Sequence, residues 1–187
     1  MASDTKQRMI EGAVRLLAAR GLHKTSFTEV LQATGAPRGS IYHHFPEGKD
    51  QLISLAVGQA GANAIDLMKT FEGQKAAEVA DRFLSLWRNL LIMDDFRSGC
   101  SVLAVTVGTD SPELLGHASE VFSSWRAILT ELLSAGGLHP SDAAGFAALL
   151  IASTEGAVAV SRAARSIEPF EFVADELVRR AALYPRV

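Results

Sequence analysis

Apolar residues recur along most of this chain at intervals of three and four, which is the spacing of amphipathic α-helices. No stretch shows the alternation of apolar and polar residues that marks a half-buried β-strand. The clearest apolar face belongs to a helix predicted over about residues 4–20, and consists of Ile10, Ala13, Val14 and Leu17. The pattern predicts an all-α protein with about nine helices.

Two short helices are predicted to follow. Ser26 and Glu29 have the spacing of a capping box, so a helix begins beside them and ends at Gly35. The fixed φ of Pro37 suits a first helical turn, and the next helix must end at Phe45, because a proline follows it. Two such helices joined by a three-residue turn have the dimensions of a helix-turn-helix, in which the second helix enters the DNA major groove.

Six further helices are predicted in the rest of the chain. They are one over about Lys49–Phe71, one marked by Val79, Phe83, Leu86, Trp87 and Leu90, one within Cys100–Val107, one from Ser111 to Gly136, and two over about Ser141–Arg165 and Pro169–Leu183. The third of these could be a buried strand or a short helix, and a helix is favoured because all the other predicted elements are helices. The last two have large apolar anchors at Phe146, Leu149, Leu150, Phe172 and Leu177. We expect a DNA-binding domain over residues 1–48 and a helical body over residues 49–187, with the division inside a continuous helix.

Composition and charge narrow the class of protein. Hydrophobic residues make up 48% of the chain and the mean hydropathy is +0.16, which is enough apolar material for a substantial core. Charged residues interrupt the longest apolar stretches, so no membrane partner is expected. The first residues lack the apolar region of a signal peptide and Cys100 is the single cysteine, which favours a cytoplasmic location. The net charge of -3 divides into +2 over residues 1–50 and -5 beyond, which suits a phosphate-facing N-terminus.

The second short helix has the composition of a DNA-reading helix. Its two turns carry Arg38, Gly39, Ser40, Tyr42, His43 and His44. Only Ile41 and Phe45, at i and i+4, can anchor it in a core. An arginine can form a bidentate pair with guanine, and Tyr42 can bind a phosphate or contact a thymine methyl group. The alternative is that Tyr42, His43 and His44 merely cover the core of the N-terminal domain.

These segments resemble the N-terminal domain of TetR-type regulators, over roughly residues 5–55. The resemblance is carried by Gly21, Thr25, Ser26, the run Gly35–Phe45, Lys49 and Leu52, and Pro37 stands where serine is common in the family. The run Pro37–Pro46 and the pair Gly99–Cys100 are similar to the branch of lincomycin-resistance repressors. The resemblance implies contacts to the major groove or its phosphates from Arg38, Ser40, Tyr42, His43 and His44. It also implies phosphate-backbone contacts from Ser26, Thr28 and Lys49. Lys49 begins a helix, where an anion is already favoured.

The resemblance also implies a body that binds a small apolar or amphipathic effector. A largely apolar pocket with a few polar groups could be lined by Phe83, Trp87, Phe96, His117, Phe122, Trp125, Phe146 and Glu155. Aromatic residues at helical spacing are also common in ordinary cores. Glu155 could pair with a cationic ligand or accept hydrogen bonds from Ser153, Arg162 or a neighbouring helix.

The resemblance places a homodimer interface on the last two helices. The penultimate helix is rich in small residues that let another helix approach closely, namely Ala143, Ala144, Gly145, Ala147, Ala148, Gly156, Ala157 and Ala159. The alternative is that these residues pack only within their own chain.

No catalytic, metal or cofactor site is predicted. The histidines lack metal-ligand spacing, Cys100 lies in an apolar run that favours a buried thiol, and no glycine-rich phosphate loop is present. We therefore expect a ligand-responsive repressor that binds a palindromic DNA operator as a dimer, rather than an enzyme. The alternative is a helical small-molecule-binding protein or enzyme that keeps a vestigial DNA-binding domain, and an activator would use the same DNA site.

Overall fold

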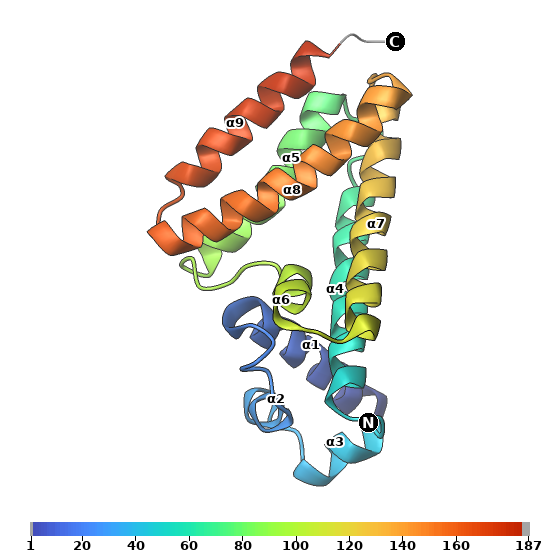
Figure 1. Ribbon diagram of the computed structural model, residues 1–187, viewed down its shortest axis with the longest axis vertical. Helices are drawn as coiled ribbons and strands as arrows, with labels where there is room; N and C mark the ends of the chain where they lie inside the picture. Colours follow the sequence, from blue (N-terminus) through green and yellow to red (C-terminus); the bar gives the residue numbers. More distant parts are fainter. Residues whose placement is uncertain (1, 185–187) are drawn as a thin grey trace. The chain divides into compact units, whose positions relative to one another are not determined.

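The computed structural model describes residues 2–184, which form an all-helical chain (Figure 1). The helices within this range are α1 Ala2–Arg20, α2 Phe27–Thr34, α3 Arg38–His44, α4 Lys49–Lys69, α5 Ala76–Met93, α6 Ser101–Gly108, α7 Pro112–Ala135, α8 Pro140–Ala164 and α9 Glu168–Leu183. The prediction of an all-α protein with about nine helices is confirmed. The segment after Gly99, which could have been a strand, forms the short helix α6, with the buried Cys100 at its N-cap.

The described chain divides into two compact units. The first consists of the residues up to Asn63 together with Cys100–Phe122, and the second consists of Ala64–Gly99 together with the residues from Ser123 onward. Helices α4 and α7 therefore contribute residues to both units. The predicted domain division at Lys49 stays a prediction.

The first unit is built around the apolar face of α1. Met9, Ala13 and Leu17 are fully buried, and α1 packs against both α2 and α6. The predicted face is confirmed, although Val14 lies at its half-buried edge. In the same unit, α4 and α7 approach closely at Gly61, where an added Cβ would lie 2.8 Å from a methyl group of Val121.

The helix-turn-helix has the local signals that the sequence indicated, with two differences. Ser26 caps α2 by accepting the backbone N–H of Glu29 at 3.2 Å. The second half of the predicted capping box is wrong, because the Glu29 carboxylate binds Arg20 at 2.6 Å instead. Pro37 occupies the N-cap of α3, one residue before the first turn, with its backbone extended (ψ 137°).

The second unit packs α5, α8 and α9 against one another (Figure 1). Phe83, Phe146 and Phe170 are among its buried side chains. The prediction of Phe172 as a core anchor is wrong, since this side chain is 68% exposed. The buried positions of α9 start at Phe170 and recur at intervals of three and four, which places Phe172 on the opposite side of the helix.

A bidentate ion pair joins α5 to α9 in the second unit. Arg88 donates from Nε and Nη2 to the two carboxylate oxygens of Glu171, at 2.7 and 2.9 Å. The hydrogen bond to Glu171 is the largest cause that raises the pKa of Arg88 above its usual value, and partial burial opposes it. The guanidinium of Arg88 also lies 5.9 Å from the ring centre of Phe170. The pair therefore fixes α9 on α5 through charge as well as apolar packing.

Helix α8 is long and apolar enough to cross a membrane, with a mean hydropathy of 1.7 over its most apolar stretch. Half of that stretch is buried inside the protein, and core helices of water-soluble proteins have the same properties. Its buried side carries Phe146, Leu150 and Val158, whereas Ala148 and Gly156 are exposed. The helix is therefore a core element with a second, small-residue face.

Candidate nucleic-acid interface

The turn between α2 and α3 is formed by Gly35, Ala36 and Pro37. Gly35 has a φ of 66°, in the left-handed region that favours glycine, and its N–H donates to the carbonyl of Leu31 at 2.9 Å. Ala36 is buried, so the turn is held against the core. This local geometry ends α2 and lets α3 start at Arg38, three residues after Gly35.

Helix α3 is anchored on one side and exposed on the other. Ile41 and Phe45 are 0% and 1% exposed, as the sequence predicts. Arg38, Gly39 and His43 are exposed, and His44 is half-buried with its ring 5.3 Å from that of His43. Only one edge of the helix is used for packing, so the other is available for contacts outside the protein.

Tyr42 lies on this exposed side but has a defined support. Its side chain is 70% exposed, and its ring packs edge-on against Phe27 at 5.7 Å between centroids. Tyr42 therefore does not cover the core, and its hydroxyl is carried outward by a ring that α2 holds in place. Phe27, the first residue of α2, is a supporting residue that the sequence analysis did not single out.

Two of the predicted serine contacts already have hydrogen bonds within the protein. Ser40 donates its hydroxyl to the carbonyl of Pro37 at 2.6 Å, which leaves its oxygen as an acceptor. Ser26 accepts the N–H of Glu29, so its own hydroxyl hydrogen can still be donated. Thr28 is exposed in the first turn of α2, where unpaired backbone N–H groups favour an anion.

Lys49 has a contact that residue type alone does not reveal. Its ammonium group donates to the carbonyl of Leu22 at 3.1 Å, which ties the first residue of α4 to the turn between α1 and α2. An ammonium group has three donors, so this contact is compatible with a phosphate contact. Lys6, which the sequence analysis did not single out, lies 5.9 Å from the ring centre of Phe45 at the end of α3. No local sequence signal places Lys6 there, because the contact joins residues far apart in the chain.

The predicted effector-binding residues belong to different units. His117 and Phe122 lie in the first unit, and the second unit holds Phe83, Trp87, Phe96, Trp125, Phe146 and Glu155. Within the second unit, the rings of Trp87 and Trp125 meet at 6.4 Å. Phe83, Trp125, Phe146 and Glu155 are buried, whereas Trp87 and Phe96 are half-buried. In the first unit, His117 Nδ1 lies 2.5 Å from the hydroxyl of Ser54, which joins α7 to α4.

Two cavities in the second unit lie away from these residues. One, of about 70 Å³, is lined by Lys75, Ala76, Gly136 and Leu138 among others, and is too small for a drug-sized molecule. The other, of about 410 Å³, is an open groove whose walls include Glu78, Asp81 and Arg82. None of the predicted effector-binding residues lines either cavity.

Comparisons with known proteins agree with the helix-turn-helix geometry. Residues 9–56 match the family described as bacterial regulatory proteins, tetR family, and residues 76–176 match the C-terminal domain of LmrA/YxaF-like transcriptional regulators. The chain is 34% identical over 179 residues to Rv0196, an uncharacterized HTH-type transcriptional regulator of Mycobacterium tuberculosis (strain H37Rv), covering 92% of this chain and 91% of the relative. It is 26% identical to the HTH-type transcriptional regulator LmrA of Bacillus subtilis (strain 168), covering 89% of this chain and 90% of the relative.

Solved structures extend the agreement to the fold. A TetR transcriptional regulator from Chloroflexus aurantiacus has a TM-score of 0.80 and 26% identity, over 100% of this chain and 98% of that one. A TetR-family regulator from Agrobacterium tumefaciens has a TM-score of 0.82 at 21% identity, over 96% of this chain and 98% of that one, which shows the same fold. These relatives are transcriptional regulators and not enzymes. Together with the exposed second helix of its helix-turn-helix, these matches show that the chain belongs to the TetR family of transcriptional regulators, in the LmrA/YxaF-like branch.

Proposed function

We propose that this TetR-family regulator is a cytoplasmic, ligand-responsive repressor that binds a palindromic operator as a homodimer and is released by a small apolar or amphipathic effector. The single observation that carries the DNA-binding part is the division of α3 into two sides. Ile41 and Phe45 are buried, whereas Arg38, Tyr42 and His43 are exposed on a helix that the turn after Gly35 holds firmly. A recognition helix needs one buried side and one exposed side, because its base contacts require a fixed scaffold.

The proposed DNA contacts follow from the chemistry of each exposed group. Arg38, in the first turn of α3, suits a bidentate contact to guanine, and Tyr42 suits a phosphate or a thymine methyl group. Further groove contacts are proposed for Gly39, Ser40, His43 and His44. Backbone contacts are proposed for Ser26, Thr28 and Lys49, which lie at the starts of α2 and α4, where helix dipoles favour phosphate.

The proposed dimer interface is the exposed face of α8 together with α9. Regulators of this family bind DNA as dimers. Of the small residues predicted for the interface, Ala143, Ala147 and Ala157 are buried within the chain, and the exposed ones are Ala144, Gly145, Ala148, Gly156 and Ala159. On the neighbouring α9, Phe172 is 68% exposed, and Val160 of α8 is 56% exposed. Large apolar groups beside a small-residue face are typical of helix pairs that pack closely with a partner.

The proposed effector site includes the two tryptophans. Trp87 on α5 is half-buried and contacts Trp125 on α7, so the pair combines apolar surface with partial access. The remaining proposed contacts are Phe83, Phe96, His117, Phe122, Phe146 and Glu155. An apolar or amphipathic effector suits a site whose residues are mainly aromatic with a few polar groups.

The decisive experiment is a footprint on the promoter region beside the protein's own gene. We expect protection of two half-sites whose centres lie about one helical turn, roughly 34–36 Å, apart. Fluorescence anisotropy with this DNA should show an affinity that falls steeply as salt increases, and a scrambled sequence of the same length is the matched control. Equal affinity for the two sequences at every salt concentration would refute a sequence-specific regulator.

A further inference from the structure

The connection between α5 and α6, residues 94–99, is held in an unfavourable backbone conformation. Asp95 and Phe96 are consecutive non-glycine residues with φ values of 50° and 57°. Side chains disfavour this left-handed region, because Cβ comes too close to the following carbonyl oxygen. Such a conformation persists only where surrounding contacts hold it.

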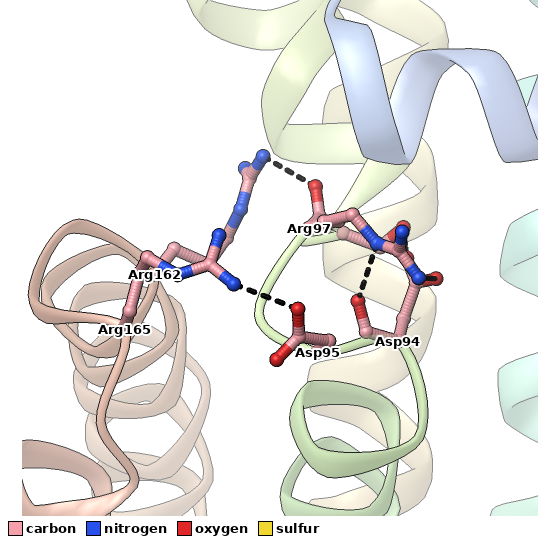
Figure 2. A network of polar contacts seen from close by, with 6 residues as sticks. Asp94, Asp95, Arg97, Arg162 and Arg165 are labelled. Atoms are coloured by element: carbon pink, nitrogen blue, oxygen red, sulfur yellow. Dashed lines mark hydrogen bonds and ion pairs between the residues drawn. The ribbon is translucent and has the colours of Figure 1, made fainter.

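The N–H of Phe96 donates to the carbonyl of Leu91 at 2.8 Å, and two arginines from the end of α8 add long-range contacts (Figure 2). Arg165 donates from Nη2 to a carboxylate oxygen of Asp95 at 2.7 Å. Arg162 donates from Nη2 to the backbone carbonyl of Arg97 at 2.8 Å. Arg165 is itself left-handed, with a φ of 49°, at the residue that ends α8. The left-handed residues on both sides therefore meet in one ion pair.

Gly99, the last residue of the connection, leaves room for the side chain of Arg162. A Cβ on Gly99 would lie 3.0 Å from Nη1 and 3.3 Å from Cδ of Arg162. The absence of a side chain thus lets the Arg162 guanidinium reach the connection. The next residue, Cys100, is the N-cap of α6, so the held segment leads directly into that helix.

Helix α6 in turn contacts the DNA-binding part of the first unit. It packs against α1, and at its end a Cβ on Gly108 would lie 3.1 Å from Cβ of Leu22. Leu22 lies in the turn between α1 and α2, and its carbonyl accepts the ammonium group of Lys49. Helix α6 therefore contacts the same turn that Lys49 joins to α4.

We propose that Arg162 and Arg165 form a latch on residues 94–99, and that this latch positions α6 against the turn that precedes the helix-turn-helix. Both arginines are positioning residues, which act through α6 and not by touching DNA. The inference rests on the proposed function and concerns its regulation. Because α8 also carries the proposed dimer face, a change in that helix reaches the DNA-binding helices through the chain itself.

Hydrogen exchange in the full-length protein tests the latch without a known effector. Arg165→Gln removes one charge from an ion pair whose side chains are 62% and 63% exposed. Lys69→Gln is the matched control, because it removes the same charge from an exposed pair at the end of α4, whose side chains are 56% and 75% exposed, outside the proposed dimer face. An exposed ion pair contributes little to stability, so we expect amide hydrogen exchange to be only about two- to five-fold faster in Arg165→Gln than in the wild type. The acceleration should appear in α6 and in residues 17–26, and the control should leave both at the wild-type rate.

Gly99→Ala provides a second variant that leaves the Asp95 pair intact and displaces the Arg162 guanidinium. It should accelerate exchange in the same two segments, and both latch variants should weaken operator binding about three-fold relative to Lys69→Gln. Acceleration confined to residues 94–99, or operator affinity equal to the control, would overturn the latch. Failure of the proposed function gives a different result, since the wild-type protein would then lack sequence-specific DNA binding altogether.

Discussion

Lys49 connects the stability of the N-terminal helices with their proposed contact to DNA. Its ammonium group bonds the Leu22 carbonyl at 3.1 Å, and it begins α4, where a phosphate is favoured. Replacing Lys49 by methionine keeps most of the half-buried stem and removes the charge and the donor. We expect this variant to lose both stability and part of its salt-dependent DNA affinity.

The two losses have separate magnitudes. A hydrogen bond from a charged group is worth about 1.5–3 kcal/mol, and the partial exposure of Lys49 places the expected loss near the lower limit, about 1.5 kcal/mol. Each phosphate contact contributes about 0.9 to the slope of log affinity against log salt. A dimer loses two such contacts, so the slope should fall by about 2.

Chemical denaturation and anisotropy titrations at several salt concentrations measure the two quantities on the same samples. Lys69→Met is the matched control, because Lys69 ends the same helix, is 56% exposed and pairs only locally with Asp66. It should change neither quantity beyond a few tenths of a kcal/mol. An unchanged salt slope in Lys49→Met would refute the phosphate contact, and an unchanged free energy of unfolding would refute the tether to Leu22.

Four further outcomes test other parts of the molecule. Arg38→Ala should weaken operator binding by about 1–3 kcal/mol and relax the preference at one base pair, as measured with operators that carry single-base changes; an unchanged preference would contradict base reading. Ala148→Glu should give a monomer in sedimentation, whereas Ala62→Glu, an equally small exposed position on α4, should leave a dimer; a wild-type monomer at micromolar concentration would refute the interface. Arg88→Met should lower the free energy of unfolding by about 1 kcal/mol, a figure reduced for the partial exposure of Glu171. Because the pKa of Arg88 is raised, its contribution is fully present below the ordinary arginine pKa, so calorimetry should give the same loss at pH 6 and pH 9. A ligand that quenches the two tryptophans should bind about 5- to 150-fold more weakly in the presence of saturating operator, by reciprocity of linkage; equal binding would refute the release mechanism.

Local signals predicted the helix-turn-helix well because each depends on neighbours in the chain. Gly35 ends α2 through its own φ, and Ser26 starts that helix through a bond three residues away. Ile41 and Phe45 are buried because α3 and its C-cap hold only this one pair of apolar residues at a spacing of i and i+4. Such features need no knowledge of the rest of the fold.

Features that depend on contacts between distant residues could not be predicted from the sequence. Phe170 and Phe172 are chemically identical and two positions apart, and only the packing of α9 on α5 and α8 decides which one is buried. In the same way, Glu29 was predicted to complete a capping box, but Arg20 at the end of α1 attracts its carboxylate. An ionic partner at 2.6 Å competes successfully with a weaker bond to a backbone N–H.

The sequence also did not predict that several of the proposed DNA-contacting side chains make contacts within the protein. Ser40 bonds the Pro37 carbonyl, Lys49 bonds the Leu22 carbonyl, and the ring of Tyr42 rests on Phe27. Residue type indicates that these groups can contact DNA, but not that each is already restrained. The restraint matters for affinity, because a side chain that is ordered in the free protein loses less conformational entropy on binding, about 0.5–1.5 kcal/mol for each mobile side chain. Phe27→Leu should therefore weaken operator binding through Tyr42, although Phe27 is not among the proposed DNA contacts. In a Tyr42→Phe background the same substitution should cost less, and equal losses in the two backgrounds would show that Phe27 does not act through the tyrosine hydroxyl.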